Sequence, residues 1–496
     1  MTRARVLAGL PFAALLALAM HVRLTGTHAA LLYPDGYQYL LMARGIAEHL
    51  QPTTMLGPGG DAFVPNPDAA LKPLFPILVA GTHAVGLSWL EAARVVTSVA
   101  GAVAVTALAL LVARIGRSTI AGLGAGLLLL TSPTASFWSG FSGPDPLAQA
   151  LVLTAALAFV VRRPRLGGIL TALAIAARPE VAVLALAAAL VTATRKPYRG
   201  DLVRAATTTI VATALLFASV RTPLAFPEWR LVALALLLVP AVTVAALVLP
   251  ATRRLRVGVA LSAVLVLLAV LREPGPGELA RAEWPLLVLA GVALVALLVD
   301  GRRAPATAFT MVGVLALGGV YLLKNPSLTR YFSLVLPAAA LLAGLAVTSV
   351  PRRLRPVTLA AVALVALAGV DRSFPGSRDY DVFAEVASRV APKLDGAPLV
   401  TAAPDAYGFW LPAHPVQRMR PGARGAVMLD AAQRLYEPRL TARGVVTARV
   451  TEEIAFARPD GEIDAGPAVV VAGTVVTRRA GSHELRQVAA HGTAPG

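Results

Sequence analysis

The stretches LLYPDGYQYLLMARGIAEHL (Leu31–Leu50) and LKPLFPILVAG (Leu71–Gly81) open and close the segment around which the chain is organised. Asp35 lies a few residues past the end of the first apolar run, and Lys72 opens the next apolar stretch. Charge beside hydrocarbon is costly unless it is paired or used, so such residues are candidates for a functional site. We therefore expect this segment to be the first loop outside a membrane and to carry the site.

The composition predicts a polytopic membrane protein. Of the 496 residues, 57% are hydrophobic and only 15% are charged, which is more apolar than a soluble domain. The chain has no cysteine, so disulfides and thiolate metal sites are excluded. The seven histidines are scattered without the spacing of metal ligands. We expect no metal and no cofactor.

The formal net charge of +18 does not predict nucleic-acid binding. Nineteen basic residues fall in short clusters between apolar runs, with only two acids among them, Asp201 and Asp300. Short basic loops mark the cytoplasmic face of a membrane protein. The clusters are Arg3 and Arg5; Arg114 and Arg117; Arg162, Arg163 and Arg165; Arg195, Lys196, Arg199 and Arg204; Arg253, Arg254 and Arg256; Arg302 and Arg303; and Arg352, Arg353 and Arg355.

The length and charge rules together predict about thirteen spanning helices. We interpret the N-terminal apolar run, about residues 6–22, as a retained first span rather than a cleaved signal peptide, and residues 23–90 as the first outer loop. The run PLFPILVAGTHAVGL is too short to span and has no basic cluster after it, so it is expected along the outer interface. The N-terminus is then cytoplasmic and the C-terminus extracytoplasmic.

Two later segments complete the outer face. A span from about Ile120 is expected to end in an outer loop, SPTASFWSGFSGPD. Two short helices, about residues 166–177 and 181–194, are expected to be joined by an outer turn at residues 178–180. Helices this short place the turn below the membrane surface.

From Arg372 the composition becomes more polar, and Gly and Pro become frequent. DYDVFAEVASRVAPKL has helical periodicity, whereas APLVTAA and PAVVVAGTVV are short β-branched runs typical of strands. We expect residues 1–371 to form the transmembrane domain and residues 372–496 a small extracytoplasmic α/β domain, with a disordered tail after about Gln487.

The first outer loop supplies three candidate site residues. Asp35 is a solvated acid or helix N-cap on one interpretation and a functional carboxylate on the other. Lys72 either extends to the lipid headgroups or binds a phosphate. Tyr39 belongs to an amphipathic segment suited to the interface and is a candidate for substrate binding.

Five further residues are candidates on the outer face. Asp145 opens a helix, so it is an N-cap or contacts a substrate hydroxyl or a cation. Arg178 and Glu180 either pair with each other or bind a phosphate or sugar. Arg330 and Tyr331 either anchor a helix at the interface or bind substrate, since Arg suits phosphate oxygens.

These motifs, taken in order, resemble the membrane glycosyltransferases of the GT-C superfamily. The resemblance is closest to the branch that contains protein O-mannosyltransferases and the aminoarabinose transferase of lipid A, and it covers about residues 1–355. Each motif is weak alone, and the ordered set with the topology is more specific. The motifs are Asp35 within PDGYQYLLMARGIAEH, Lys72-Pro73-Leu74, Asp145-Pro146-Leu147, Ala177-Arg178-Pro179-Glu180, and Arg330-Tyr331 with Pro337.

The resemblance implies an outer cavity, a polyprenyl-phosphate sugar donor and an inverting transfer. It implies that Asp35 is the catalytic carboxylate and that Lys72 and Arg330 hold the donor phosphate. Many relatives have two adjacent acids at the first position, whereas Gly36 follows Asp35 here. The chemistry is consistent: a carboxylate accepts the proton of an acceptor hydroxyl, and cations stabilise the departing lipid phosphate in place of a metal.

Two other function classes compete with a transferase. A transporter or flippase of lipid-linked sugars would place ionisable residues or broken helices near mid-membrane, often in paired repeats. A scaffold that only presents the C-terminal domain would not need Asp35 and Lys72. For the transferase we expect the plasma membrane as location and a cell-envelope glycan, lipid or protein as acceptor.

Overall fold

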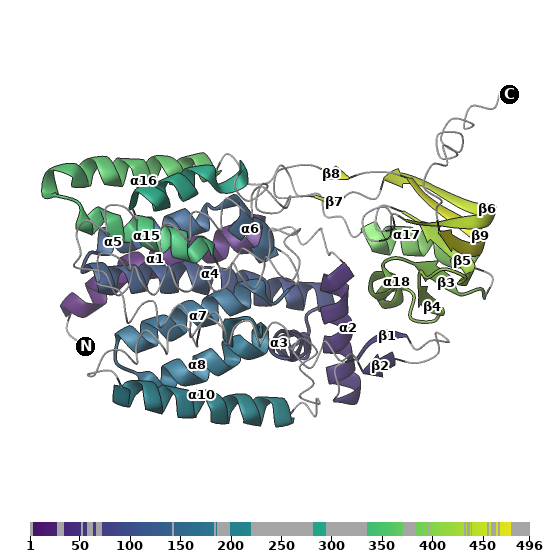
Figure 1. The fold of residues 1–496 in the computed structure, drawn as a ribbon, viewed down its shortest axis with the longest axis horizontal. Coiled ribbons are helices and arrows are strands. Elements are labelled where there is room, and N and C mark those ends of the chain that lie inside the picture. The colour runs from purple at the N-terminus through teal and green to yellow at the C-terminus, as the bar shows by residue number, and fades with distance from the viewer. Residues whose placement is uncertain are drawn as a thin grey trace, which may run out of the picture.

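The computed structural model consists of a bundle of helices with a sheet domain at one end (Figure 1). All statements below concern the residues that the structure describes. These are residues 3–26, 34–50, 53–56, 63–65, 72–140, 143–182, 185, 199–219, 281–293, 335–370, 382–394, 396–430, 433, 437, 439–453, 456–457, 463–464 and 467–477.

The helical part holds long apolar helices and several shorter ones. Its labelled helices are α1 (Arg3–Gly26), α2 (Pro34–His49), α3 (Leu74–His83), α4 (Trp89–Gly116), α5 (Thr119–Leu130), α6 (Pro133–Gly140), α7 (Asp145–Val160), α8 (Pro164–Ala177), α10 (Arg199–Ser219), α15 (Leu336–Ser349) and α16 (Arg355–Val370), the last preceded by the 3-10 turn η4 (Arg352–Leu354). A further helix covers residues 281–293.

Within the described residues, two helices are long and apolar enough to cross a membrane. They are α4 and the helix over residues 352–370. The bent pair α5 and α6 adds a third if it forms one span. The predicted count of about thirteen spans includes many residues outside the described part and stays a prediction.

Helix α4 lies at the centre of the bundle, in contact with α1, α3, α5, α7 and α15. The sequence Ser-Trp-Leu-Glu fixes its start by a capping box. The Ser88 hydroxyl accepts a hydrogen bond from the Glu91 amide at 3.3 Å, and the Glu91 carboxylate accepts one from the Ser88 amide at 2.9 Å. The helix then continues for 28 residues to Gly116.

Small residues let these helices pack closely, as is usual in membrane bundles. At Gly122 of α5, an added Cβ would lie against the backbone oxygen of Ala109 and 2.8 Å from the Ala113 Cβ. At Gly344 of α15, it would lie 2.7 Å from the Ala125 Cβ. The backbones of α4, α5 and α15 therefore approach to a distance that only glycine permits.

Helices α2 and α3 run across the direction of the long helices rather than along it (Figure 1). Helix α2 lies between the bundle and the sheet domain, and α3 is seen nearly end-on beside it. The two helices contact each other, and α3 contacts α4 and α8. The ten residues of α3 are too short to span a bilayer. The expectation that this run is too short to span is confirmed, and its position along the outer interface stays a prediction.

Two stretches that were expected to be loops contain helix. The stretch expected as an outer loop from Ser132 contains α6, which is bent by 66° from α5. The buried Glu283 carboxylate accepts hydrogen bonds from the Thr134 amide at 2.8 Å and the Ser132 hydroxyl at 2.6 Å, which caps α6. Arg23, expected to begin the first outer loop, lies within α1 and is buried.

The C-terminal part contains a mixed five-stranded sheet with the strand order β4-β3-β5-β9-β6. Strand β3 is parallel to β4 and β5, and β9 is antiparallel to β5 and β6. The expected helix and both expected strands are confirmed as α17, β3 and β9. The elements are α17 (Val382–Val390), η5 (Ala391–Lys393), β3 (Leu399–Thr401), α18 (Pro404–Trp410), β4 (Val416–Arg418), β5 (Arg424–Leu429), β6 (Leu440–Glu453), β7 (Phe456–Ala457), β8 (Ile463–Asp464) and β9 (Pro467–Thr477).

The sheet domain packs against the bundle through α2. Helices α17 and α18 lie between α2 and the sheet (Figure 1), and α18 contacts α2. One continuous cluster of buried side chains extends from Phe12 in α1 through Tyr37 in α2 to Val470 in β9. The short hairpin of β1 (Thr53–Leu56) and β2 (Phe63–Pro65) follows α2 and contacts α18.

Several expectations fall on residues outside the described part. They concern Arg330 and Tyr331, the spans over much of residues 183–334, the domain boundary near residue 371, and the tail after Gln487.

We predict that Gly122→Ala destabilises the bundle. The new methyl group forces α5 away from α4, and such overpacking costs about 1–3 kcal/mol. Gly81→Ala in α3 is the matched control, because nothing lies within 4 Å of its added Cβ. Thermal unfolding of the purified protein in detergent should show a lower melting temperature for the first variant only. Equal melting temperatures for both variants would contradict the close packing of α4 and α5.

Candidate functional site

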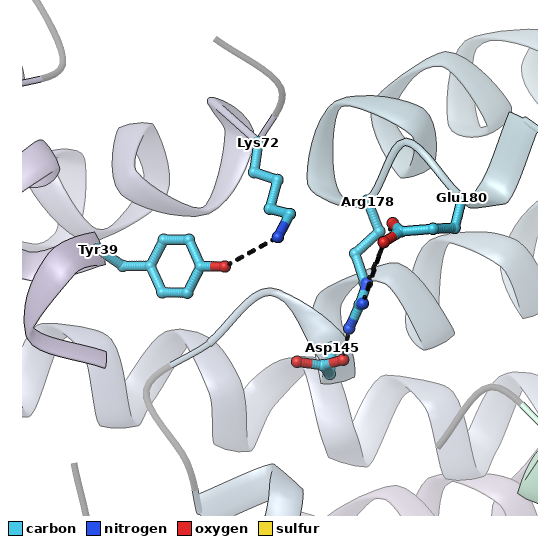
Figure 2. A network of polar contacts seen from close by, with 5 residues as sticks. All are labelled: Tyr39, Lys72, Asp145, Arg178 and Glu180. Atoms are coloured by element: carbon cyan, nitrogen blue, oxygen red, sulfur yellow. Dashed lines mark hydrogen bonds and ion pairs between the residues drawn. The ribbon is translucent and has the colours of Figure 1, made fainter. Parts of the chain in front are cut away.

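A buried ion cluster joins α7 to the end of α8. Arg178 follows α8 directly, Asp145 is the first residue of α7, and Glu180 lies in the turn after Arg178. Arg178 Nη1 donates to Asp145 Oδ1, while Nε and Nη2 donate to the two Glu180 oxygens at 3.4 Å each. Figure 2 shows the guanidinium group between the two carboxylates. The exposed fractions of Arg178, Asp145 and Glu180 are 2%, 2% and 7%.

The contacts in this cluster test two of the structural interpretations made from the sequence. The pairing of Arg178 with Glu180 is confirmed, as is the turn at residues 178–180. The N-cap role for Asp145 is wrong, because Pro144 is the cap residue and there is no side-chain capping bond. The Asp145 carboxylate binds the cation of Arg178 instead, since burial in an apolar bundle makes an opposite charge the best available partner. A donor-phosphate role for Arg178 stays a prediction.

Lys72 and Tyr39 form a second polar contact at the same end of the bundle. Lys72 Nζ donates to the Tyr39 hydroxyl at 3.5 Å, and the Tyr39 ring packs edge-on against Phe75 with centroids 5.6 Å apart. Figure 2 shows the Lys72 side chain extending into the space between Tyr39 and Arg178. Helix α3, which starts two residues after Lys72, contacts α8, which ends at Ala177.

Helix α2 presents two different faces. Successive helical residues are rotated by about 100°, so positions 35 and 39 share a face, whereas position 37 lies about 200° from position 35. The face with position 39 contacts Lys72 and Phe75. The face with position 37 contacts the C-terminal domain through Phe383, Phe409 and Trp410. Position 35, in the first turn of α2, is therefore on the Lys72 side of the helix.

The structure thus brings together Tyr39 with Lys72, and Asp145 with Arg178 and Glu180. It places Asp35 in the first turn of α2, and Arg330 and Tyr331 lie outside the described residues. Within the described part, no group of three or more His, Asp or Glu residues is arranged to hold a metal ion.

Three buried residues that join elements distant in the sequence were not predicted from the sequence. Arg23 donates to the Leu130 carbonyl at 3.2 Å at the end of α5, and Glu283 caps α6. Both are charges beside apolar runs, and that signal could have identified them. Tyr37, 1% exposed, was seen only as part of an amphipathic segment, because its partner Trp410 is 373 residues away.

Comparison with protein-family models finds no match, and comparison with curated protein sequences finds none either. Comparison with solved structures does find matches. ArnT from Cupriavidus metallidurans bound to undecaprenyl phosphate has a TM-score of 0.57 at 15% identity, over 92% of this chain and 97% of that one. The chain has the GT-C fold. The fold that the ordered motifs implied is thereby confirmed.

Archaeal oligosaccharyltransferase has the same fold. The apo enzyme from Archaeoglobus fulgidus matches with a TM-score of 0.56 at 13% identity, over 92% of this chain and 74% of that one. Its complex with an inhibitory peptide and a dolichol-phosphate matches with a TM-score of 0.52 at 13% identity, over the same shares. The described part of this chain combines a small sheet domain with apolar helices, two of which are long enough to cross a membrane.

We predict that Arg178→Ala strongly destabilises the protein, because it leaves the Asp145 and Glu180 carboxylates buried without a cation. Breaking a buried pair from one side typically costs about 3–5 kcal/mol. Arg162→Ala is the control: Arg162 pairs with Asp201 at 3.1 Å, but these side chains are 55% and 30% exposed. An exposed pair contributes about 1 kcal/mol or less. The free energy of unfolding should separate the two variants, and similar losses would show that the Arg178 cluster is solvated.

Proposed function

We propose that this protein is an inverting glycosyltransferase that moves a sugar from a polyprenyl-phosphate donor to an acceptor hydroxyl outside the plasma membrane. The observation that carries the proposal is the match to ArnT along nearly the whole of both chains, in a structure that holds undecaprenyl phosphate. The acceptor is a cell-envelope glycan, lipid or protein. The N-terminus is cytoplasmic, and the C-terminal domain is extracytoplasmic.

Asp35 is the general base of this reaction. An acceptor hydroxyl is a weak nucleophile near neutral pH, and a carboxylate within hydrogen-bond reach takes its proton as it attacks. The sugar carbon then resembles an oxocarbenium ion, as in glycoside hydrolysis. The position of Asp35 supports this role, because residue 35 shares a helix face with Tyr39, and Tyr39 contacts Lys72.

Lys72 and Arg330 bind the donor phosphate and stabilise the charge that grows on it as the glycosidic bond breaks. Arg178 is the third cation proposed for the phosphate site, and its contacts with Asp145 and Glu180 orient its guanidinium group. Asp145, Glu180, Tyr39 and Tyr331 then line the substrate side of the site.

We predict that Asp35→Asn abolishes transfer without loss of stability. Loss of a general base costs about 10²–10⁴-fold in rate. The Asn side chain has nearly the same size and shape as the Asp side chain, so stability should change little. The assay incubates purified protein with a panel of polyprenyl-phosphate sugars and measures donor cleavage, which a flippase would not perform.

Asp201→Asn is the matched control. Asp201 pairs with the exposed Arg162, which lies just before the start of α8, whereas Arg178 follows the end of α8. This variant should turn over at the wild-type rate. Full turnover by Asp35→Asn would move the base elsewhere, and no cleavage of any donor by the wild type would refute the transferase.

We predict that Lys72→Gln raises the KM for the donor roughly 10- to 100-fold, as expected for loss of a charge-assisted hydrogen bond. Lys393→Gln, on the exposed surface of the C-terminal domain, should leave the KM unchanged. Steady-state kinetics across donor concentrations measures both. An unchanged KM in Lys72→Gln would assign the phosphate to other residues.

A further inference from the structure

The C-terminal domain contacts the first turn of α2. Tyr37 is 1% exposed, and its hydroxyl accepts a hydrogen bond from Trp410 Nε1 at 3.1 Å. Trp410 is the last residue of α18. This bond joins residues 373 apart in the sequence and links the helix of Asp35 directly to the sheet domain.

Aromatic packing surrounds this bond. The Tyr37 ring lies edge-on to Phe383 of α17 with centroids 5.4 Å apart, and tilted against Phe409 of α18 at 5.5 Å. Phe383 in turn packs edge-on against Tyr407 at 5.3 Å. Aromatic pairs of this geometry contribute beyond their buried area. Side chains of the C-terminal domain therefore pack closely against the face of α2 that carries Tyr37.

A second contact fixes the far end of α2. Strand β1 follows the helix closely, and it contacts both α18 and β4 of the C-terminal domain. Helix α2 is thus held at its first turn through Tyr37 and beyond its last turn through β1. Its opposite face is left to contact α3 and Lys72.

The first turn of a helix is its weakest, because its amides lack intrahelical partners and the end frays. Asp35 lies in this turn, two residues before Tyr37. A general base must be held in a narrow range of positions, since a misplacement of about 1 Å can cost about 10²-fold in rate. A contact that keeps this turn closed therefore also keeps the backbone of residue 35 in place.

We propose that Trp410 is a positioning residue for Asp35 that acts through Tyr37. The C-terminal domain is then part of the reaction site. This inference rests on the proposed function, because it concerns the placement of the base in that reaction. Trp410 touches neither donor nor acceptor; it holds the turn that carries the base.

The test compares Trp410→Phe, Tyr37→Phe and the double variant in the full-length protein. Each single change removes one partner of the hydrogen bond and keeps an aromatic ring. We expect kcat to fall about three- to tenfold in each, the range for loss of one hydrogen bond. The KM for the donor should not change, because Lys72 is untouched. The double variant should lose no more than either single variant, because both act through one bond.

Tyr407→Phe is the matched control. The Tyr407 hydroxyl donates to Asp430 Oδ2 at 2.8 Å within the C-terminal domain, and burial with the nearby Asp430 charge raises the pKa of Tyr407. This variant also loses one tyrosine hydroxyl bond in the same domain and keeps the ring beside Phe383. It should lower the melting temperature at least as much as Trp410→Phe and leave kcat at the wild-type value.

Several results, obtained with an active wild type, would overturn this inference and leave the proposed function standing. They are a wild-type kcat in Trp410→Phe, an equal loss of kcat in Tyr407→Phe, or additive losses in the double variant. A rise in KM without a fall in kcat would also overturn it, because the contact would then serve donor binding. A wild type that cleaves no donor refutes the proposed function instead, and the inference with it.

Discussion

A single buried guanidinium group holds two helix ends together at the end of the bundle where α2 crosses. Arg178 contacts Asp145 at the start of α7 and Glu180 just after α8, and all three side chains are almost fully buried. In a low-dielectric interior, each charge is tolerated only because the others are present. This ion cluster therefore links α7 to the end of α8. Helix α3, which starts just after Lys72, contacts α8 as well as α2 and α4.

The two faces of α2 have different roles: one packs against the C-terminal domain, and the other faces the proposed site. One face gives Tyr37 to the C-terminal domain, where Trp410 and two phenylalanines hold it. The other face places position 35 with Tyr39 and Lys72. A helix lying across the end of the bundle can do both, because residues two positions apart point to nearly opposite sides of a helix. A span along the bundle, surrounded by other spans, would have no free face for a substrate.

Local patterns predicted much of this fold. The short helix α3, the turn at Arg178, helix α17 and strands β3 and β9 each follow from apolar length, periodicity or β-branched runs in a few neighbouring residues. The features that were missed depend on distant partners. Helix α6 was mistaken for a loop because its cap, Glu283, is 149 residues beyond Thr134. Asp145 was interpreted as a cap because Arg178 lies 33 residues later, and the Tyr37 contact needed a domain that begins hundreds of residues on.

The central claim is that the donor phosphate binds beside α2, on the face that carries positions 35 and 39. The most direct measurement is a structure of the protein with undecaprenyl phosphate bound, determined by electron cryo-microscopy in a lipid nanodisc. We predict phosphate density in contact with Lys72 Nζ, on the same side of α2 as residue 35. Phosphate density bound away from Lys72, or on the face of α2 that packs against Trp410, would contradict it.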